Sequence, residues 1–202
     1  SLSGSDITFS ASDNYNGSEE FSISVSDGEY SDSQSITVAV LAVNDMPVAN
    51  AASAETSEDQ DVVISLSGSD IDGDALNFSL ASDASNGSVA LDGSFAIYTP
   101  NTNYNGDDSF SFSVSDGEYS SSADVSVSVS AVNDAPVLAV VSDISFDEDG
   151  AGSISLSADD VDGDSLEFSI IGGDQITASL SGSDITFSAP DNYNGSESFT
   201  VS

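Results

Sequence analysis

Apolar and polar residues alternate with a period of two along most of the chain. Serine occupies many of the intervening positions, and Phe110, Phe112 and Val114 alternate with Ser111 and Ser113 in this way. This alternation predicts antiparallel β-strands with one buried face and one wet face. No stretch has the period of a helix. In the stretch 49–137 the alternating runs are 62–66, 76–80, 89–91, 95–97, 110–114 and 125–129, with Phe95 and Ile97 expected on the apolar face.

Turn signals separate these runs. They are Asp-Gly or Asn-Gly pairs, which favour tight turns between strands, and they lie at 72–73, 86–87, 92–93, 105–106 and 116–117. About seven short strands in about 90 residues are typical of a β-sandwich.

The same landmarks recur at a fixed step. Val-Asn-Asp-x-Pro occurs at 43–47 and at 132–136, so that Asn133 follows Asn44 by 133 − 44 = 89 residues. The sequence therefore predicts an all-β chain of tandem Greek-key β-sandwich repeats with this period. We place the C-terminal part of one repeat at 1–46, a complete repeat at 47–136 and the N-terminal part of a further repeat at 137–202.

The two outer segments overlap in sequence. Residues 1–24 match 179–202 except at Ser12, Glu20, Ser22 and Ile23. Half a repeat cannot bury its own apolar face, so two incomplete domains are expected in an isolated chain. Two interpretations stay open: the sequence is a window of a longer chain, or strands of another subunit complete these domains.

The composition excludes most catalytic chemistry. The chain has 36 acidic residues and no Lys, Arg, His or Cys, which gives a net charge of −36. It therefore lacks an imidazole base, a thiolate and a Schiff-base lysine. Its charge repels nucleic acid and anionic membranes and attracts cations, and no apolar run is long enough to insert into a membrane. Paired carboxylates could hydrolyse a sugar, but the acids lie in edge turns, so we predict that the chain is not an enzyme.

The acids recur in columns that flank the strands. Two carboxylates about 4 Å apart at a surface repel by roughly 4 kcal/mol, so several at one joint require a cation. Calcium accepts six to eight oxygen ligands from irregular loops. The acids of Asp70-Ile71-Asp72-Gly73-Asp74 and of its repeat at Asp160 are interpreted either as a turn between strands or as ion ligands, and Asn133-Asp134 either as a turn before a rigid proline or as ligands.

In their order, these motifs resemble the cadherin repeats of large bacterial surface adhesins. The resemblance spans the chain and rests on Glu58, Asp-x-Asp at Asp70, an acid before a late strand, Val-Ser-Asp-Gly at 114–117, and Val-Asn-Asp-x-Pro-Val. It implies cadherin-like or Ig-like sandwiches with Ca²⁺ between consecutive domains. The implied ligands before the complete repeat are Glu19, Asn44, Asp45, Asp70, Asp72 and Asp116. The implied ligands after the complete repeat are Glu58, Asp108, Asn133, Asp134, Asp160 and Asp162.

The sequence departs from the cadherin pattern in the linker. Met46 and Ala135 replace the second linker aspartate, and Ala42 and Ala131 replace the aspartate two residues before the asparagine. One or two ions per junction are therefore expected.

The resemblance implies a calcium-rigidified spacer in an extracellular adhesin or surface fibre. Its expected partners are calcium ions and neighbouring repeats or other copies of the chain. The alternative is a carbohydrate-binding or homophilic adhesion module, for which glycans would be the partners.

Overall fold

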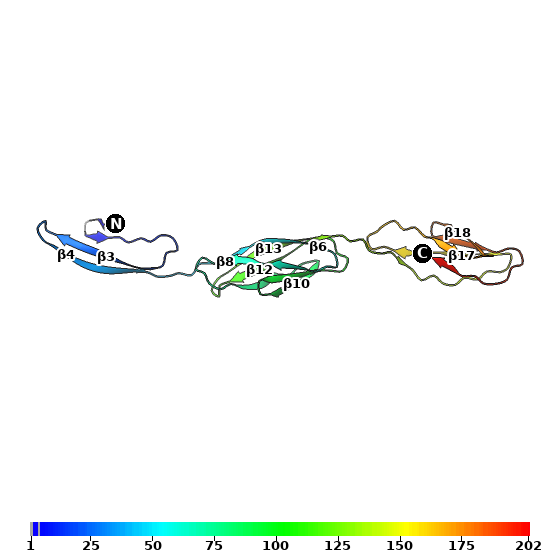
Figure 1. Ribbon diagram of the computed structural model, residues 1–202, viewed down its shortest axis with the longest axis horizontal. Helices are drawn as coiled ribbons and strands as arrows, with labels where there is room; N and C mark the ends of the chain where they lie inside the picture. The colour runs from blue at the N-terminus through cyan, green and yellow to red at the C-terminus, as the bar shows by residue number, and fades with distance from the viewer. Residues whose placement is uncertain (1, 4) are drawn as a thin grey trace. The chain divides into compact units, whose positions relative to one another are not determined.

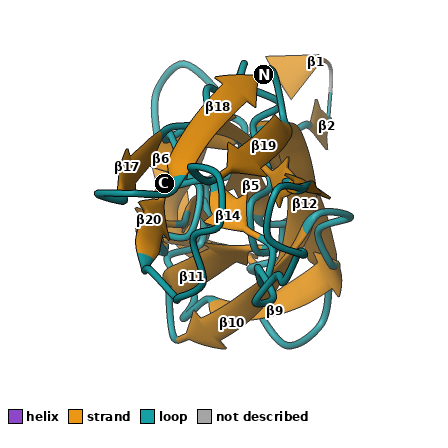
Figure 2. Ribbon diagram, turned by 90° about the vertical axis from the view of Figure 1, so that its right-hand side faces the viewer, coloured by secondary structure: helices purple, strands orange, loops and turns teal. Residues whose placement is uncertain are grey.

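The structure is a computed structural model that describes residues 2–3 and 5–202. Within these residues only strands, turns and loops occur (Figure 2), so no helix there could span a membrane. This confirms the predicted all-β class. The chain divides into two compact units, 1–130 and 131–202. The predicted repeat boundaries, after residues 46 and 136, fall in the strand-free segments 41–47 and 131–136.

The described residues of the first unit form thirteen strands, several of which are labelled in Figure 1. They are β1 (Leu2–Ser3), β2 (Asp6–Ile7), β3 (Gly17–Ser26), β4 (Ser31–Val40), β5 (Val48–Asn50), β6 (Ala52–Ser57), β7 (Val62–Ser65), β8 (Ser67–Ser69), β9 (Asn77–Ser82), β10 (Gly87–Asp92), β11 (Phe95–Pro100), β12 (Gly106–Ser115) and β13 (Ser120–Ser130). The second unit contains β14 (Val137–Leu138), β15 (Ala151–Ser155), β16 (Ala158–Asp159), β17 (Ile170–Gly172), β18 (Thr177–Ser181), β19 (Asp184–Ser188) and β20 (Phe199–Val201).

Strands β6, β7 and β9 to β13 form a β-sandwich of two sheets, and β5 pairs with β8 in a separate antiparallel ladder. One sheet has the order β6-β13-β12-β9 and the other has the order β10-β11-β7. Strand β6 pairs parallel with β13, whereas the other pairs in both sheets are antiparallel. The alternation of β12 and β13 places Phe110, Phe112, Val125 and Val127 in the core, each at most 2% exposed. The β-sandwich prediction is confirmed.

The predicted inner face of β11 is wrong. Phe95 is 49% exposed, whereas Ala96 and Tyr98 are completely buried. The inward-facing positions of β11 are therefore shifted by one residue from those that its apolar pattern predicts. Such a shift exchanges the core face and the solvent face of a strand. The physical reason is that the Tyr98 hydroxyl donates a hydrogen bond to Asp108 (2.9 Å), which permits a tyrosine in the interior.

The outer segments of the chain show what a repeat loses without its other half. In the second unit, Ile185 and Phe187 pack with Phe146 and Phe168 and are 0% and 6% exposed. Their sequence equivalents in the first unit, Ile7 and Phe9, are both 38% exposed. Their burial in the second unit therefore requires apolar residues from the first half of the same repeat.

Candidate metal site

Three aspartates of one loop converge immediately after β8. One carboxylate oxygen from each of Asp70, Asp72 and Asp74 lies within 4.8 Å of the other two. Gly73 makes the turn between them with a φ of 83°, which glycine adopts without the steric cost of a side chain. At this separation each pair of charges repels by roughly 3–4 kcal/mol at an effective dielectric constant of about 20.

The two oxygens of Asp70 have different surroundings. Oδ1 accepts the backbone N–H groups of Asp72, Gly73 and Asp74 at 2.9, 3.1 and 3.2 Å, and this shapes the loop. Oδ2 is buried and accepts no hydrogen bond from the described part of the chain. An unsatisfied buried polar atom costs about 1–3 kcal/mol, more when it is charged. A cation beside Oδ2 would remove this cost.

The linker that precedes the complete repeat is attached to the same loop. The backbone N–H of Asp45 donates to Oδ2 of Asp72 at 2.7 Å. The side-chain amide of Asn44 donates to Oδ2 of Asp116 at 2.9 Å. The structure thus brings five of the six residues expected at this junction into one connected group.

Asp116 is itself held by the turn between β12 and β13. Its Oδ1 accepts the N–H groups of Tyr119 and Glu118, both at 2.7 Å. The N–H of Tyr119, followed by that of Glu118 and the amide of Asn44, lowers the pKa of the Asp116 carboxyl against the effect of desolvation. Asp116 therefore stays ionised beside the linker.

Glu19, the sixth expected residue, is not part of this group in the structure. It lies on the exposed hairpin strand β3, opposite Val38. Its carboxylate accepts the hydroxyl of Tyr15 at 3.3 Å.

The second unit repeats the loop arrangement. Oδ1 of Asp160 accepts the N–H groups of Asp162 and Asp164, both at 3.1 Å. The N–H of Asp134 donates to Oδ2 of Asp162 at 2.7 Å, as Asp45 does to Asp72. Asn133 differs from Asn44, because its amide donates to the carbonyl of Asp134 at 2.9 Å.

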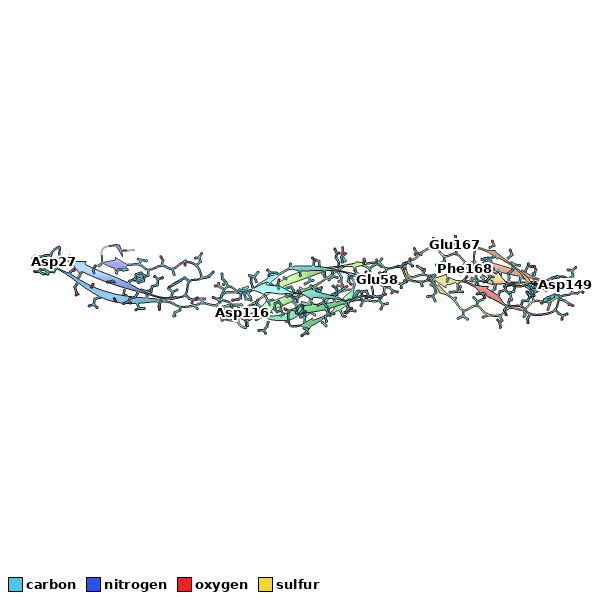
Figure 3. All side chains as sticks on the ribbon, viewed as in Figure 1. Asp27, Glu58, Asp116, Asp149, Glu167 and Phe168 are labelled. Atoms are coloured by element: carbon cyan, nitrogen blue, oxygen red, sulfur yellow. The ribbon has the colours of Figure 1, made fainter. Side chains whose placement is uncertain are left out.

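Glu58 lies at the end of the central sandwich opposite to Asp116 (Figure 3). Its side chain is only 3% exposed, and its N–H donates to the carbonyl of Ser130 at 2.9 Å. The expected role of Glu58 as an ion ligand after the complete repeat stays a prediction.

Asp108 is a buried carboxylate that the protein itself saturates. Its oxygens accept the N–H groups of Ser85, Asn86 and Ser109 and the hydroxyl of Tyr98, at 2.9–3.1 Å. Burial raises the pKa of this carboxyl, but the four hydrogen bonds outweigh burial, so its pKa lies below the usual value. Burial and Asp108 together raise the pKa of Tyr98. The expected role of Asp108 as an ion ligand also stays a prediction.

Sequence reasoning left Asp74 undecided and missed the Tyr98–Asp108 pair. For Asp74, the signal was the Gly73 turn, which folds the third acid back toward the first two. For Tyr98 and Asp108, no local signal exists, because they meet only when β11 and β12 face each other across the two sheets.

Comparisons with known proteins agree with this fold. A search of the curated proteins found no match. Among solved structures, the extracellular cadherin domains 1–4 of protocadherin gamma B7 match with a TM-score of 0.53 and 18% identity, covering 91% of this chain and 56% of that one. PcdhgB3 domains 1–4 match with a TM-score of 0.55 and 13% identity, covering 87% and 49%. At these identities the similarity establishes the fold alone.

A third structure, the endo-fucoidan hydrolase MfFcnA4 of glycoside hydrolase family 107, matches with a TM-score of 0.39 and 18% identity. The match covers 88% of this chain and 30% of that one, and a score this low supports no argument. The chain spans about a third to a half of the length of these three structures. The family model described as "Bacterial Ig domain" matches residues 44–128 and 133–202. The chain therefore belongs to the bacterial Ig domain family, in a tandem array of cadherin-like β-sandwiches.

Proposed function

We propose that this chain is a calcium-rigidified spacer of an extracellular adhesin or surface fibre. Calcium would bind at the joints, where the loop Asp70–Asp74 and its repeat at Asp160 meet the linker. The observation that carries the proposal is the buried Oδ2 of Asp70, which has no hydrogen-bond partner in the described chain and belongs to a cluster of three carboxylates.

The chemistry of the donors favours calcium over other cations. The candidate ligands are all oxygens, which hard cations prefer, and they come from an irregular loop and a linker. Magnesium requires nearly ideal octahedral geometry, which such a set supplies less readily. The chain has no Lys, Arg or His, so no side chain of its own can neutralise the cluster.

The proposed extracellular location sets the affinity that we expect of such sites. Extracellular calcium modules bind with dissociation constants of about 10⁻⁴–10⁻³ M. If calcium is about 100-fold above the dissociation constant, each site adds roughly 2.7 kcal/mol to the stability of the state that binds. The similar repeats, with serine at many outward strand positions, support a spacer rather than a recognition module, because a recognition site requires a distinctive surface.

Calorimetric titration of the chelator-treated chain with calcium tests this proposal. We expect binding in the millimolar range or tighter, with weaker binding of magnesium. The double variant Asp70→Asn/Asp160→Asn should lose most of this binding. Asp124→Asn, which removes an exposed carboxylate from the middle of β13, should bind calcium as the wild type does. Absence of calcium binding by the wild type at millimolar concentration would overturn the proposal.

A further inference from the structure

The two linkers share one contact with the acidic loops. In each, the N–H of the linker aspartate donates to Oδ2 of the middle loop aspartate at 2.7 Å: Asp45 to Asp72, and Asp134 to Asp162. The first pair is 27 residues apart and the second 28. Because the contact is kept when the spacing changes by one residue, it depends on the shape of the loop and not on the length of the chain between them.

Two other features of the linkers do not recur in this way. Asn44 donates its amide to Asp116, whereas Asn133 donates its amide to the carbonyl of Asp134. Pro47 is buried but Pro136 is exposed. The two linkers therefore share the hydrogen bond from the aspartate N–H to the middle loop carboxylate, although their asparagines have different partners and their prolines differ in burial.

Through this contact, the carboxylate of the middle loop aspartate adjoins both the other candidate ligands and the linker backbone. Asp72 lies within the cluster of candidate ligands, and its Oδ2 accepts the linker N–H. An ionised carboxylate has about four lone-pair positions, so it can hold an ion and accept an N–H together. Any movement of Asp72 is therefore transmitted to the backbone of the linker.

We infer that Asp72 and Asp162 are positioning residues that couple the ion site to the linker through a backbone hydrogen bond. The inference rests on the proposed calcium binding. An ion that fixes the carboxylate of Asp72 also fixes the N–H of residue 45, and the direction in which the linker leaves the sandwich is then set by the loop. The side chain of Asp45 is not needed for this coupling.

Hydrogen exchange at the amides of residues 45 and 134, measured by NMR in the full chain with and without calcium, tests this inference. Without calcium, Asp72→Ala should accelerate exchange at residue 45 about tenfold, since hydrogen bonds to charged acceptors are among the stronger ones. Exchange at residue 134 in the same molecule serves as the internal control and should not change. Asp162→Ala should accelerate exchange at residue 134 and leave exchange at residue 45 unchanged.

Three variants distinguish coupling through Asp72 from a direct contact between the ion and the linker. Asp72→Asn keeps an acceptor oxygen and should retain most of the protection at residue 45 without calcium. Asp45→Ala keeps the backbone N–H, so calcium should still slow exchange there. Asp72→Ala should abolish this calcium effect at residue 45 at a calcium concentration where calorimetry shows that the variant still binds the ion.

Equal exchange at residue 45 in the wild type and in Asp72→Ala would overturn the inference, even if calcium binds. Failure of calcium binding would instead overturn the proposed function, while the calcium-free comparison would still decide whether Asp72 holds the linker.

Discussion

Asp108 offers the sharpest test of the forces that hold the complete repeat together. It is 9% exposed and accepts four hydrogen bonds, two of which come from the loop before β10 and one from the fully buried hydroxyl of Tyr98. We consider Asp108→Asn, which keeps the shape of the side chain. In one orientation the new NH₂ group faces the N–H groups of Ser85 and Ser109, and in the other it faces the N–H of Asn86 and the hydroxyl of Tyr98, which can turn to accept.

The expected loss follows from these contacts. Hydrogen bonds to a charged acceptor contribute about 1.5–3 kcal/mol each, so losing one or two gives roughly 1.5–6 kcal/mol. Ser85 is exposed, so water can replace its bond to the carboxylate, whereas no water reaches Tyr98. We therefore expect Asp108→Asn to lower the free energy of unfolding of the first unit by about 2–4 kcal/mol.

Native-state hydrogen exchange of the core amides of β12 and β13 measures this quantity. It reports on the first unit alone, whereas a denaturant melt of the full chain would mix two units that need not unfold together. The control is Asp107→Asn, which removes the same charge from the exposed neighbour on the same strand. A loss below about 0.5 kcal/mol, or an equal loss in Asp107→Asn, would refute the role given to the Asp108 hydrogen bonds.

Three other predictions follow from the same structure. Because the folded pKa of Asp108 is lowered, its contribution to stability is fully present above the unfolded pKa of about 3.9 and is lost as the pH falls through the folded pKa. Acid titration should therefore destabilise the calcium-free wild type more than Asp108→Asn. Identical profiles of stability against pH would contradict this. Gly87→Ala should cost about 1–3 kcal/mol of unfolding free energy, because its Cβ would lie 2.6 Å from the carbonyl oxygen of Thr99 and from the ring of Tyr98, whereas the exposed neighbour Ser88→Ala should be nearly neutral by the same exchange measurement. Chelation of calcium should lower the melting temperature of the wild type in calorimetry but not that of Asp70→Asn/Asp160→Asn, and an equal shift in both would count against ion binding at these loops.

The sequence predicts the sandwich well because strand alternation is a local consequence of one buried face. It predicts the wrong face for β11 because apolarity alone favours Phe95 over Tyr98 as the inner residue. The choice is made by Asp108, ten residues away, which offers the tyrosine hydroxyl an acceptor inside the core. A pattern of apolar residues carries no information about such a partner.

For the candidate metal site, the sequence indicated most of the residues that meet but not all of their contacts. The expected group of Asn44, Asp45, Asp70, Asp72 and Asp116 comes together because the linker and two turns meet at one end of the sandwich. The third loop acid, Asp74, enters the cluster through the turn at Gly73. The contact between the N–H of Asp45 and Asp72 was not predicted, because every residue other than proline has a backbone N–H and no sequence motif marks the one that is used.

The absence of cationic side chains limits how the buried carboxylate oxygens of this chain can be satisfied. With no Lys, Arg or His, a carboxylate that leaves water can be balanced only by N–H and O–H groups of the chain or by a cation from solution. At Asp108 the chain supplies donors to both oxygens, and the carboxylate is satisfied without an ion. At Asp70 the described residues supply three donors to one oxygen and none to the buried other. The same residue type therefore stabilises the fold through hydrogen bonds in one place and leaves a buried oxygen that a cation could satisfy in the other, and the placement of backbone N–H groups decides which.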